Sequence, residues 1–206
     1  KAIETPAVPK QVVIPMSQHF GAPCTPTVKV GDLVKKGQLI GTSDAFLHAD
    51  IHASTSGKVI KVAPMPHNMM VTCMAVVIEA DGKDEWAEGI PEEHDWTKLD
   101  SKEIIELIKK AGVVGCGGAT FPAHVKLAPN KPVDTFIVNG AECEPYLTCD
   151  YRSMVEKETT EKLVTGVQIC MKALGVTKGY IGIEDNKPEA IQNLTEAFKN
   201  VPGVEV

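Results

Sequence analysis

The stretch VKVGDLVKKGQLIG, residues 28–41, decides the fold of the first part of the chain. Its apolar residues stand in short groups separated by Gly-Asp and Lys-Gly pairs, which is typical of strands joined by tight turns. The pattern continues on both sides and predicts strands at residues 12–14, 27–30, 38–40 and 58–62. We therefore expect residues 1–80 to form an all-β domain, either a small barrel or a sandwich.

Residues 28–41 and 51–59 resemble the two halves of a biotinyl or lipoyl carrier domain, which is a barrel-sandwich fold. Carrier domains of this kind attach their cofactor to a lysine at the hairpin tip between the two halves. Residues 37–57 contain no lysine, and the alignment puts Phe46 or Leu47 at the tip. The resemblance therefore predicts the barrel-sandwich fold without the swinging-arm function.

An acidic connector, residues 81–99, follows the β domain, and we assign it no chemistry. The 206-residue chain has a formal net charge of −6, so it lacks the basic surface that a nucleic-acid partner selects. No apolar run approaches the roughly 18 to 20 residues that cross a bilayer, and no secretory signal pattern is seen. We expect no nucleic-acid partner and no transmembrane segment within this chain.

Residues 100–206 predict an α/β domain, because strand and helix patterns alternate there. Asp100 or Ser101 can cap a first helix, whose apolar residues recur at helical spacing. Further elements are expected as strands at residues 135–138 and 179–183, and as helices at about 154–173 and 188–199. This order predicts parallel pairing in a Rossmann-like domain, and an α+β fold for the whole chain.

Two runs in this domain suggest a ligand site. In GCGGATFP, residues 115–122, glycines let backbone N–H groups approach an anion, and Lys126 can neutralise it. NGAECEP, residues 139–145, follows a predicted strand, and parallel sheets bind ligands beyond the carboxyl ends of their strands. Glu142 and Glu144 alternate as strand residues do, so both would point the same way and favour a cationic or hydroxyl-rich ligand.

These runs, together with the opening VIPMSQHFGAP at residues 13–23, resemble the C subunit of the Rnf ion-translocating complex. They are also similar to the flavin- and NADH-binding subunit of respiratory complex I. The resemblance covers almost the whole chain. It implies an electron-transfer flavoprotein subunit that passes electrons between NADH or NAD and ferredoxin, through FMN and iron–sulfur clusters.

The same resemblance implies a place in the cell and a set of partners. The complex would translocate sodium ions or protons, and this subunit would be peripheral, on the cytoplasmic side of the bacterial inner membrane. Its partners would be the other subunits of the complex and NAD(H), with ferredoxin as a further candidate. It would be an enzyme only as a subunit of a ferredoxin:NAD oxidoreductase.

The resemblance also assigns roles to individual residues, and none of them is catalytic, because FMN carries the hydride chemistry. Three glycines would let the backbone approach FMN, a lysine would pair with it, and two strand-end residues would contact it: Gly115, Gly117, Gly118, Lys126, Asn139 and Glu142. Phe121 would stack on NADH, and Glu144 would hold its sugar hydroxyls.

The six cysteines form no Cys-x-x-Cys pair, so we expect reduced thiols and no metal site in this chain. The resemblance implies two four-iron clusters bound by cysteine runs that this sequence lacks. We therefore expect an N-terminal portion of a longer protein, inactive in isolation, with the clusters in the remainder. We interpret His48 and His52 as surface residues, and Met69 and Met70 as core residues.

Two alternatives stay open at this point. One is a cobalamin reductase of bacterial microcompartments, which shares the barrel and the flavin loop; the residues at 14–19 favour the Rnf subunit over it. The other is a non-catalytic docking module, in which the barrel serves as an assembly surface and the flavin loop is empty.

Overall fold

The computed structural model describes residues 4–116, 118–143 and 146–206, and it contains both helices and strands, as predicted. The chain divides into two compact units. The first, here called the β unit, comprises Thr5–Asp95 and Glu106–Lys126. The second, the α/β unit, comprises Glu4, Trp96–Ile105 and Leu127–Val206. The segment with the Gly-rich run thus groups with the β unit. The division predicted from the sequence, into residues 1–80, 81–99 and 100–206, placed this segment in the last of the three.

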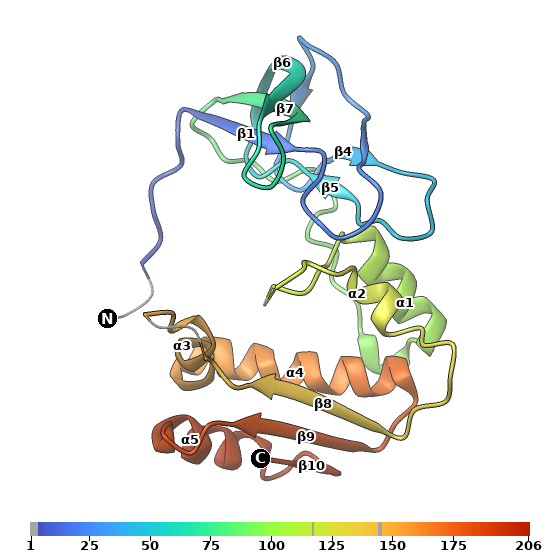
Figure 1. The fold of residues 1–206 in the computed structure, drawn as a ribbon, viewed down its shortest axis with the longest axis vertical. Helices are drawn as coiled ribbons and strands as arrows, with labels where there is room; N and C mark the ends of the chain where they lie inside the picture. Colours follow the sequence, from blue (N-terminus) through green and yellow to red (C-terminus); the bar gives the residue numbers. More distant parts are fainter. Residues whose placement is uncertain (1–3, 117, 144–145) are drawn as a thin grey trace. The chain divides into compact units, whose positions relative to one another are not determined.

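The β unit contains two small antiparallel sheets, whose strands can be followed in Figure 1. The first sheet has the order β1-β7-β6-β3, and the second has the order β2-β4-β5. The strands are β1 (Gln11–Pro15), β2 (Thr25–Pro26), β3 (Leu33–Val34), β4 (Leu39–Thr42), β5 (Ile51–His52), β6 (Gly57–Pro66) and β7 (Thr72–Ala80). Buried aliphatic residues of both sheets share one core, among them Ile14, Ile40 and Ile78. The barrel-sandwich prediction therefore has a physical basis in this common core.

Strands β6 and β7 form a long hairpin that contains a bulge. Val59 pairs with Ile78 and Lys61 pairs with Val77, so Ile60 is an extra residue in β6. In a regular strand Val59 and Val62, which are three positions apart, would face opposite sides, because side chains alternate; the bulge brings them to the same side. With it, Val59 is fully buried and Val62 also packs against the core.

The predicted strand at residues 27–30 is wrong. Those residues lead into a turn, in which the carboxylate of Asp32 accepts a hydrogen bond from the N–H of Lys29 at 2.9 Å. The Asp32 N–H in turn donates to the Lys29 carbonyl at 3.2 Å. A side chain that satisfies the backbone in this way competes with strand pairing, and the paired strands are β2 and β3 on either side.

The α/β unit is built on a parallel sheet of order β10-β9-β8, as the alternation of strands and helices predicts. Its strands are β8 (Thr135–Gly140), β9 (Lys178–Ile183) and β10 (Val204–Glu205). Its helices are α3 (Cys149–Val155), α4 (Lys157–Leu174) and α5 (Pro188–Phe198), preceded by the short 3-10 helix η1 (Trp96–Lys98). Figure 1 shows α4 running beside β8 and β9, and its buried residues Val167 and Met171 join the core under the sheet.

Two helices outside the sheet connect this unit with the Gly-rich run. Helix α1 (Ser101–Lys110) begins with a reciprocal cap between Asp100 and Glu103. The Asp100 carboxylate accepts from the Glu103 N–H at 2.9 Å, and the Glu103 carboxylate accepts from the Asp100 N–H at 2.8 Å. This confirms the predicted cap at Asp100. The second helix, α2 (Ala123–Lys126), is a single turn that follows the Gly-rich run.

The single helix predicted at about residues 154–173 is two helices, α3 and α4. They are separated at Glu156, whose backbone is extended with φ −75° and ψ 127°. The hydroxyls of Thr159 and Thr160 each donate to the Glu156 carbonyl at 2.9 Å, so the start of α4 is fixed at this residue. Helical periodicity in the sequence does not reveal such a break, because α3 and α4 both keep the pattern.

Candidate functional site

The Gly-rich run forms a closed loop in the β unit. The Gly115 N–H donates to the Phe121 carbonyl at 2.9 Å, and the Ala123 N–H donates to the Val113 carbonyl at 2.9 Å. These bonds form a narrow neck at residues 113–123. The N–H of Gly115 is therefore used to close the loop. At Gly118, whose φ is +143°, an added Cβ would meet no heavy atom within 4 Å, so this part of the loop borders open space.

Lys126 lies across the neck of that loop. A Cβ added at Gly115 would come within 2.7 Å of the Lys126 Nζ, so a side chain here would move the ammonium group from this position. The same Nζ lies 5.9 Å from the centre of the Phe121 ring, within the range of a cation–π contact. Three residues that the sequence analysis selected, Gly115, Phe121 and Lys126, are thus brought together by the structure.

The strand-end residues lie in the α/β unit, where β8 and β9 end at the same edge of the parallel sheet. Asn139 is exposed, and its Oδ1 accepts a hydrogen bond from the Ala141 N–H at 2.9 Å. The Glu142 N–H donates to the carboxylate of Glu184 at 3.3 Å, which joins the segment after β8 to the segment after β9. The prediction that residues 139–145 begin at the end of a strand is confirmed, since β8 ends at Gly140.

The Glu142 side chain is only 1% exposed, and its carboxylate is held by the fold itself. It accepts hydrogen bonds from the N–H groups of Asp150 and Tyr151, at 2.9 and 3.3 Å, in the first turn of α3. It also pairs with the Lys187 Nζ at 3.3 Å. Burial opposes ionisation of this carboxyl, but the two N–H groups and Lys187 outweigh it and lower its pKa.

Lys187 completes this arrangement. Its Nζ lies between the carboxylates of Glu142 and Glu184, at 3.3 and 3.4 Å. Burial lowers the pKa of the ammonium group, and the hydrogen bonds to the two carboxylates more than compensate, so that its pKa is raised. The strand end therefore presents a carboxylate that is neutralised within the fold.

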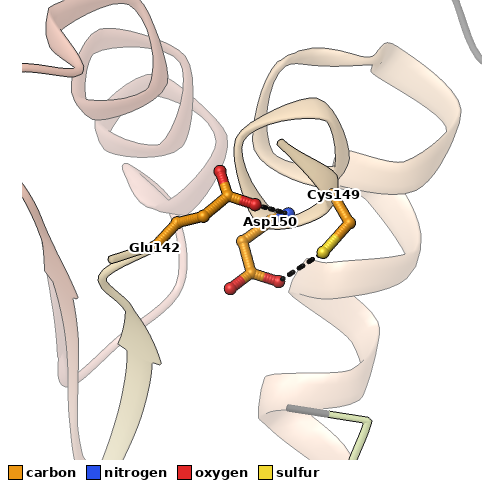
Figure 2. A group of neighbouring side chains, drawn as sticks. All are labelled: Glu142, Cys149 and Asp150. Atoms are coloured by element: carbon orange, nitrogen blue, oxygen red, sulfur yellow. Dashed lines mark hydrogen bonds between the residues drawn. The ribbon is translucent and has the colours of Figure 1, made fainter. Parts of the chain in front are cut away.

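Figure 2 shows how Glu142 lies next to Cys149 and Asp150 at the start of α3. The Cys149 thiol donates to the Asp150 carboxylate at 3.6 Å. Burial and the two neighbouring carboxylates raise the pKa of that thiol, so it stays protonated. Since Glu142 already caps α3, this group is explained by hydrogen bonding within the fold.

The predicted site residues thus form two groups that the structure describes separately. Gly115, Gly118, Phe121 and Lys126 belong to the β unit, and Asn139 and Glu142 belong to the α/β unit. Gly117 and Glu144, which complete the prediction, lie outside the described residues.

Two predictions outside these groups are wrong. His48 is buried, with its Nδ1 2.5 Å from the Ala45 carbonyl, and His52 is half-buried, so they are not surface residues. Met69 and Met70 are 84% and 41% exposed because they occupy the turn between β6 and β7. The expectation of reduced thiols fits the structure, in which all six cysteines are unpaired.

Sequence reasoning missed two residues of these groups. Lys187 lies shortly after the end of β9, and its pairing with Glu142 becomes visible only in the folded structure. Phe20 stacks against Phe121, with ring centres 5.8 Å apart and planes inclined by 20°. The two phenylalanines are far apart in sequence, and no periodic pattern relates them.

Comparisons with known proteins agree with the predicted fold class. Residues 1–83 match the family described as the RnfC barrel sandwich hybrid domain. Residues 108–206 match the family described as the Nuo51 FMN-binding domain. The chain corresponds to the N-terminal portion of the RnfC protein of the Rnf complex. The Gly-rich loop of this RnfC portion, its Lys126 and its strand-end residues all fall within the FMN-binding domain match.

Individual proteins that are similar to this chain point to the same family. A Clostridium ljungdahlii protein, named as the C subunit of a proton-translocating ferredoxin:NAD(+) oxidoreductase complex, is 58% identical over 97% of this chain and 44% of its own length. An Acetobacterium woodii protein, named as the C subunit of a Na(+)-translocating complex of that kind, is 49% identical over 96% of this chain and 45% of its own length. The chain thus spans less than half the length of these relatives.

A more distant relative is named as the C subunit of an ion-translocating oxidoreductase complex in Rhodobacter capsulatus. It is 44% identical over 94% of this chain and 37% of its own length. These matches support the RnfC assignment and do not support the cobalamin reductase alternative. Within the residues that the structure describes, no helix combines the length and the apolar character that crossing a membrane requires.

Proposed function

We propose that this chain holds FMN and receives NADH in a ferredoxin:NAD oxidoreductase complex. The observation that supports this most directly is the closed Gly-rich loop with Lys126 across its neck, within a match to an FMN-binding domain family. FMN would supply hydride acceptance as a pair of electrons and release of those electrons one at a time. The residues present fit such a group, because the loop pairs a cation with open space at Gly118.

The loop residues would bind and orient FMN. The Lys126 ammonium would form a charge-assisted contact with the anionic or polar edge of the flavin nucleotide, since a phosphate attracts a point charge of this kind. Gly115 leaves the space that this ammonium occupies. Gly117 and Gly118 would let the loop backbone approach the ligand closely.

The strand-end residues of the α/β unit carry the remaining roles. The Asn139 Oδ1 accepts from the Ala141 N–H, and its Nδ2 donor would serve the flavin. Glu142 would act on the flavin edge by holding the segment after β8 in place, because its own carboxylate is engaged by α3 and Lys187. For NADH, we propose stacking on Phe121 and hydroxyl contacts from Glu144.

We place this function within a larger assembly, as the names of the relatives suggest. The complex would couple electron transfer between NADH and ferredoxin to the movement of sodium ions or protons, and iron–sulfur clusters held by residues outside this sequence would accept the electrons. The protein would be peripheral, on the cytoplasmic side of the bacterial inner membrane. Its partners would be the other subunits, with ferredoxin as a further candidate.

A titration of the 206-residue chain with FMN, in which binding is measured by the quenching of flavin fluorescence, tests the proposal. Loss of one charge-assisted contact should weaken binding by about tenfold or more in Lys126→Ala. Lys61→Ala, which removes an exposed lysine of the same unit, should bind as the parent does. Equal affinity of Lys126→Ala and the parent would refute the role of Lys126. If the parent chain binds no FMN at all, the docking-module alternative is favoured.

A further inference from the structure

Phe20 is an exposed aromatic residue beside the Gly-rich loop. It follows β1 in the β unit, and 56% of its surface is exposed, which is unusual for a phenylalanine. One face of its ring is covered by Phe121, as the centre distance of 5.8 Å and the 20° inclination show. The two rings therefore form a small aromatic platform built from two distant parts of the sequence.

The backbone fixes this platform. The Phe20 N–H donates to the Thr120 carbonyl at 3.3 Å, so the residue before Phe121 is bonded directly to Phe20. The neighbouring His19 is buried, and its Nε2 accepts a hydrogen bond from the Ala49 N–H at 3.1 Å. The backbone around Phe20 is thus held by the Gly-rich loop on one side and, through His19, by the segment that precedes β5 on the other.

A hollow of about 660 Å³ adjoins the platform, which is within the range of small-molecule sites. Its walls include Phe20, His67 and the loop residues 118–120. The His67 ring is fixed, because its Nδ1 accepts from the N–H groups of Met69 and Met70 and its Nε2 lies 3.0 Å from the Ser17 carbonyl. His67, one wall of the hollow, is therefore held in place by hydrogen bonds.

The ring separation limits where a ligand can stack. A planar ligand ring needs about 3.5 Å on each side, and so about 7 Å between two flanking rings. Phe20 and Phe121 are already closer than that. A third ring therefore cannot lie between them and must stack on an outer face. Phe20 lines the hollow and Phe121 does not, which favours the outer face of Phe20.

We propose that Phe20 is part of the dinucleotide site, and that its outer face stacks a heteroaromatic ring of NADH while the adjoining hollow takes the connected sugar and phosphate groups. This inference rests on the proposed function, since it places in the β unit a second contact for the ligand assigned to Phe121. Phe20 is a positioning residue for the ligand and takes no part in electron transfer.

Titration of NADH, followed by its own fluorescence on the chain free of FMN, tests the inference. Base stacking on an aromatic side chain predicts that Phe20→Leu, which keeps apolar bulk, weakens NADH binding by about tenfold, whereas Phe20→Trp retains it. The unfolding midpoint of each variant, measured by circular dichroism, identifies a variant that has lost its fold. FMN affinity should change less than twofold, because the Lys126 contact is untouched.

The outcomes separate the two proposals. If Phe20→Leu binds NADH as tightly as the parent while Phe121→Ala binds it weakly, Phe20 is outside the site and the proposed function stands. If Phe121→Ala also binds like the parent, or if the parent binds no NADH, the proposed NADH site fails and the inference fails with it. A loss in Phe20→Leu that Phe20→Trp restores supports stacking, because packing volume alone would favour leucine.

Discussion

Replacing Glu142 by glutamine removes a buried negative charge from the end of β8 and keeps the shape of the side chain. In the parent, the carboxylate accepts two N–H bonds from α3 and pairs with Lys187. Hydrogen bonds to a charged group contribute about 1.5–3 kcal/mol each. Glutamine retains one acceptor oxygen, and Lys187 retains Glu184 at 3.4 Å. We therefore expect Glu142→Gln to lower the free energy of unfolding by about 2–3 kcal/mol.

Scanning calorimetry of the 206-residue chain measures this change. For a unit of roughly 100 residues, a loss of that size lowers the Tm by about 10 °C. The matched control is Glu158→Gln, which breaks an ion pair with Lys162 whose side chains are 81% and 72% exposed. Such an exposed pair contributes little, so the control should unfold at the parent temperature.

The pH dependence gives an independent check. Because the pKa of Glu142 is lowered in the folded state, its contribution is present above the ordinary value of 4.5 and is lost as pH falls through the lower, folded value. The difference between parent and Glu142→Gln should therefore be full near neutral pH and should shrink below pH 4.5. Equal midpoints for Glu142→Gln and Glu158→Gln at pH 7 would refute the reasoning.

Three further predictions follow from the β unit. Gly57→Ala should lower the free energy of unfolding, measured by urea denaturation, by about 3 kcal/mol, because the new Cβ would lie 2.0 Å from the Glu79 carbonyl oxygen. The control Gly31→Ala should lower it by about 1 kcal/mol, because no heavy atom lies within 4 Å of the new Cβ and only the φ of +99° opposes the change. Burial lowers the pKa of three histidines in this unit, His19, His52 and His124. The unfolded state therefore binds more protons than the folded state near pH 6, and the urea concentration at the unfolding midpoint should rise between pH 5 and 7.5. A midpoint that falls over this range would contradict the prediction. Burial, with a further contribution from Asp50, raises the pKa of Cys24 to about 11, so a disulfide reagent at pH 8 should modify the exposed Cys116 and leave Cys24 unmodified in mass spectra of tryptic peptides.

Most of the fold could be predicted because its elements carry local patterns. The strands β8 and β9 and the helix α5 lie within two residues of their predicted positions, since apolar periodicity and Pro188 mark them directly. The strand expected at residues 27–30 was wrong because Asp32 takes up the backbone of Lys29. The break at Glu156 was missed because side chains of Thr160 and Asn193 bond the Met154 carbonyl at the end of α3, and no periodic pattern reports such bonds. In both cases, side-chain hydrogen bonds to the backbone override the secondary structure that the apolar pattern predicts.

The candidate site could be predicted in its residues but not in its contacts. Motifs select Gly115 and Lys126, whereas the close approach of the ammonium to the Gly115 backbone is a property of the folded loop. Glu142 was selected as a ligand contact, and the structure adds that its carboxylate is bonded to α3 and Lys187. A short sequence cannot show whether a carboxylate serves a ligand or a helix, since both uses require the same acidic residue.

The extra residue Ile60 in β6 has a consequence for how homologous chains should be aligned and altered. Deleting it would leave charge and hydropathy almost unchanged and would restore a regular ladder, in which Val59 and Val62 stand two positions apart and still face the same side, because side chains alternate along a strand. A gap of one position at Ile60 in an alignment is therefore compatible with the same hairpin and the same buried face. A gap of one position between Lys61 and the hairpin turn would instead exchange the faces of the residues that follow it, so it signals an alignment error or a rebuilt hairpin.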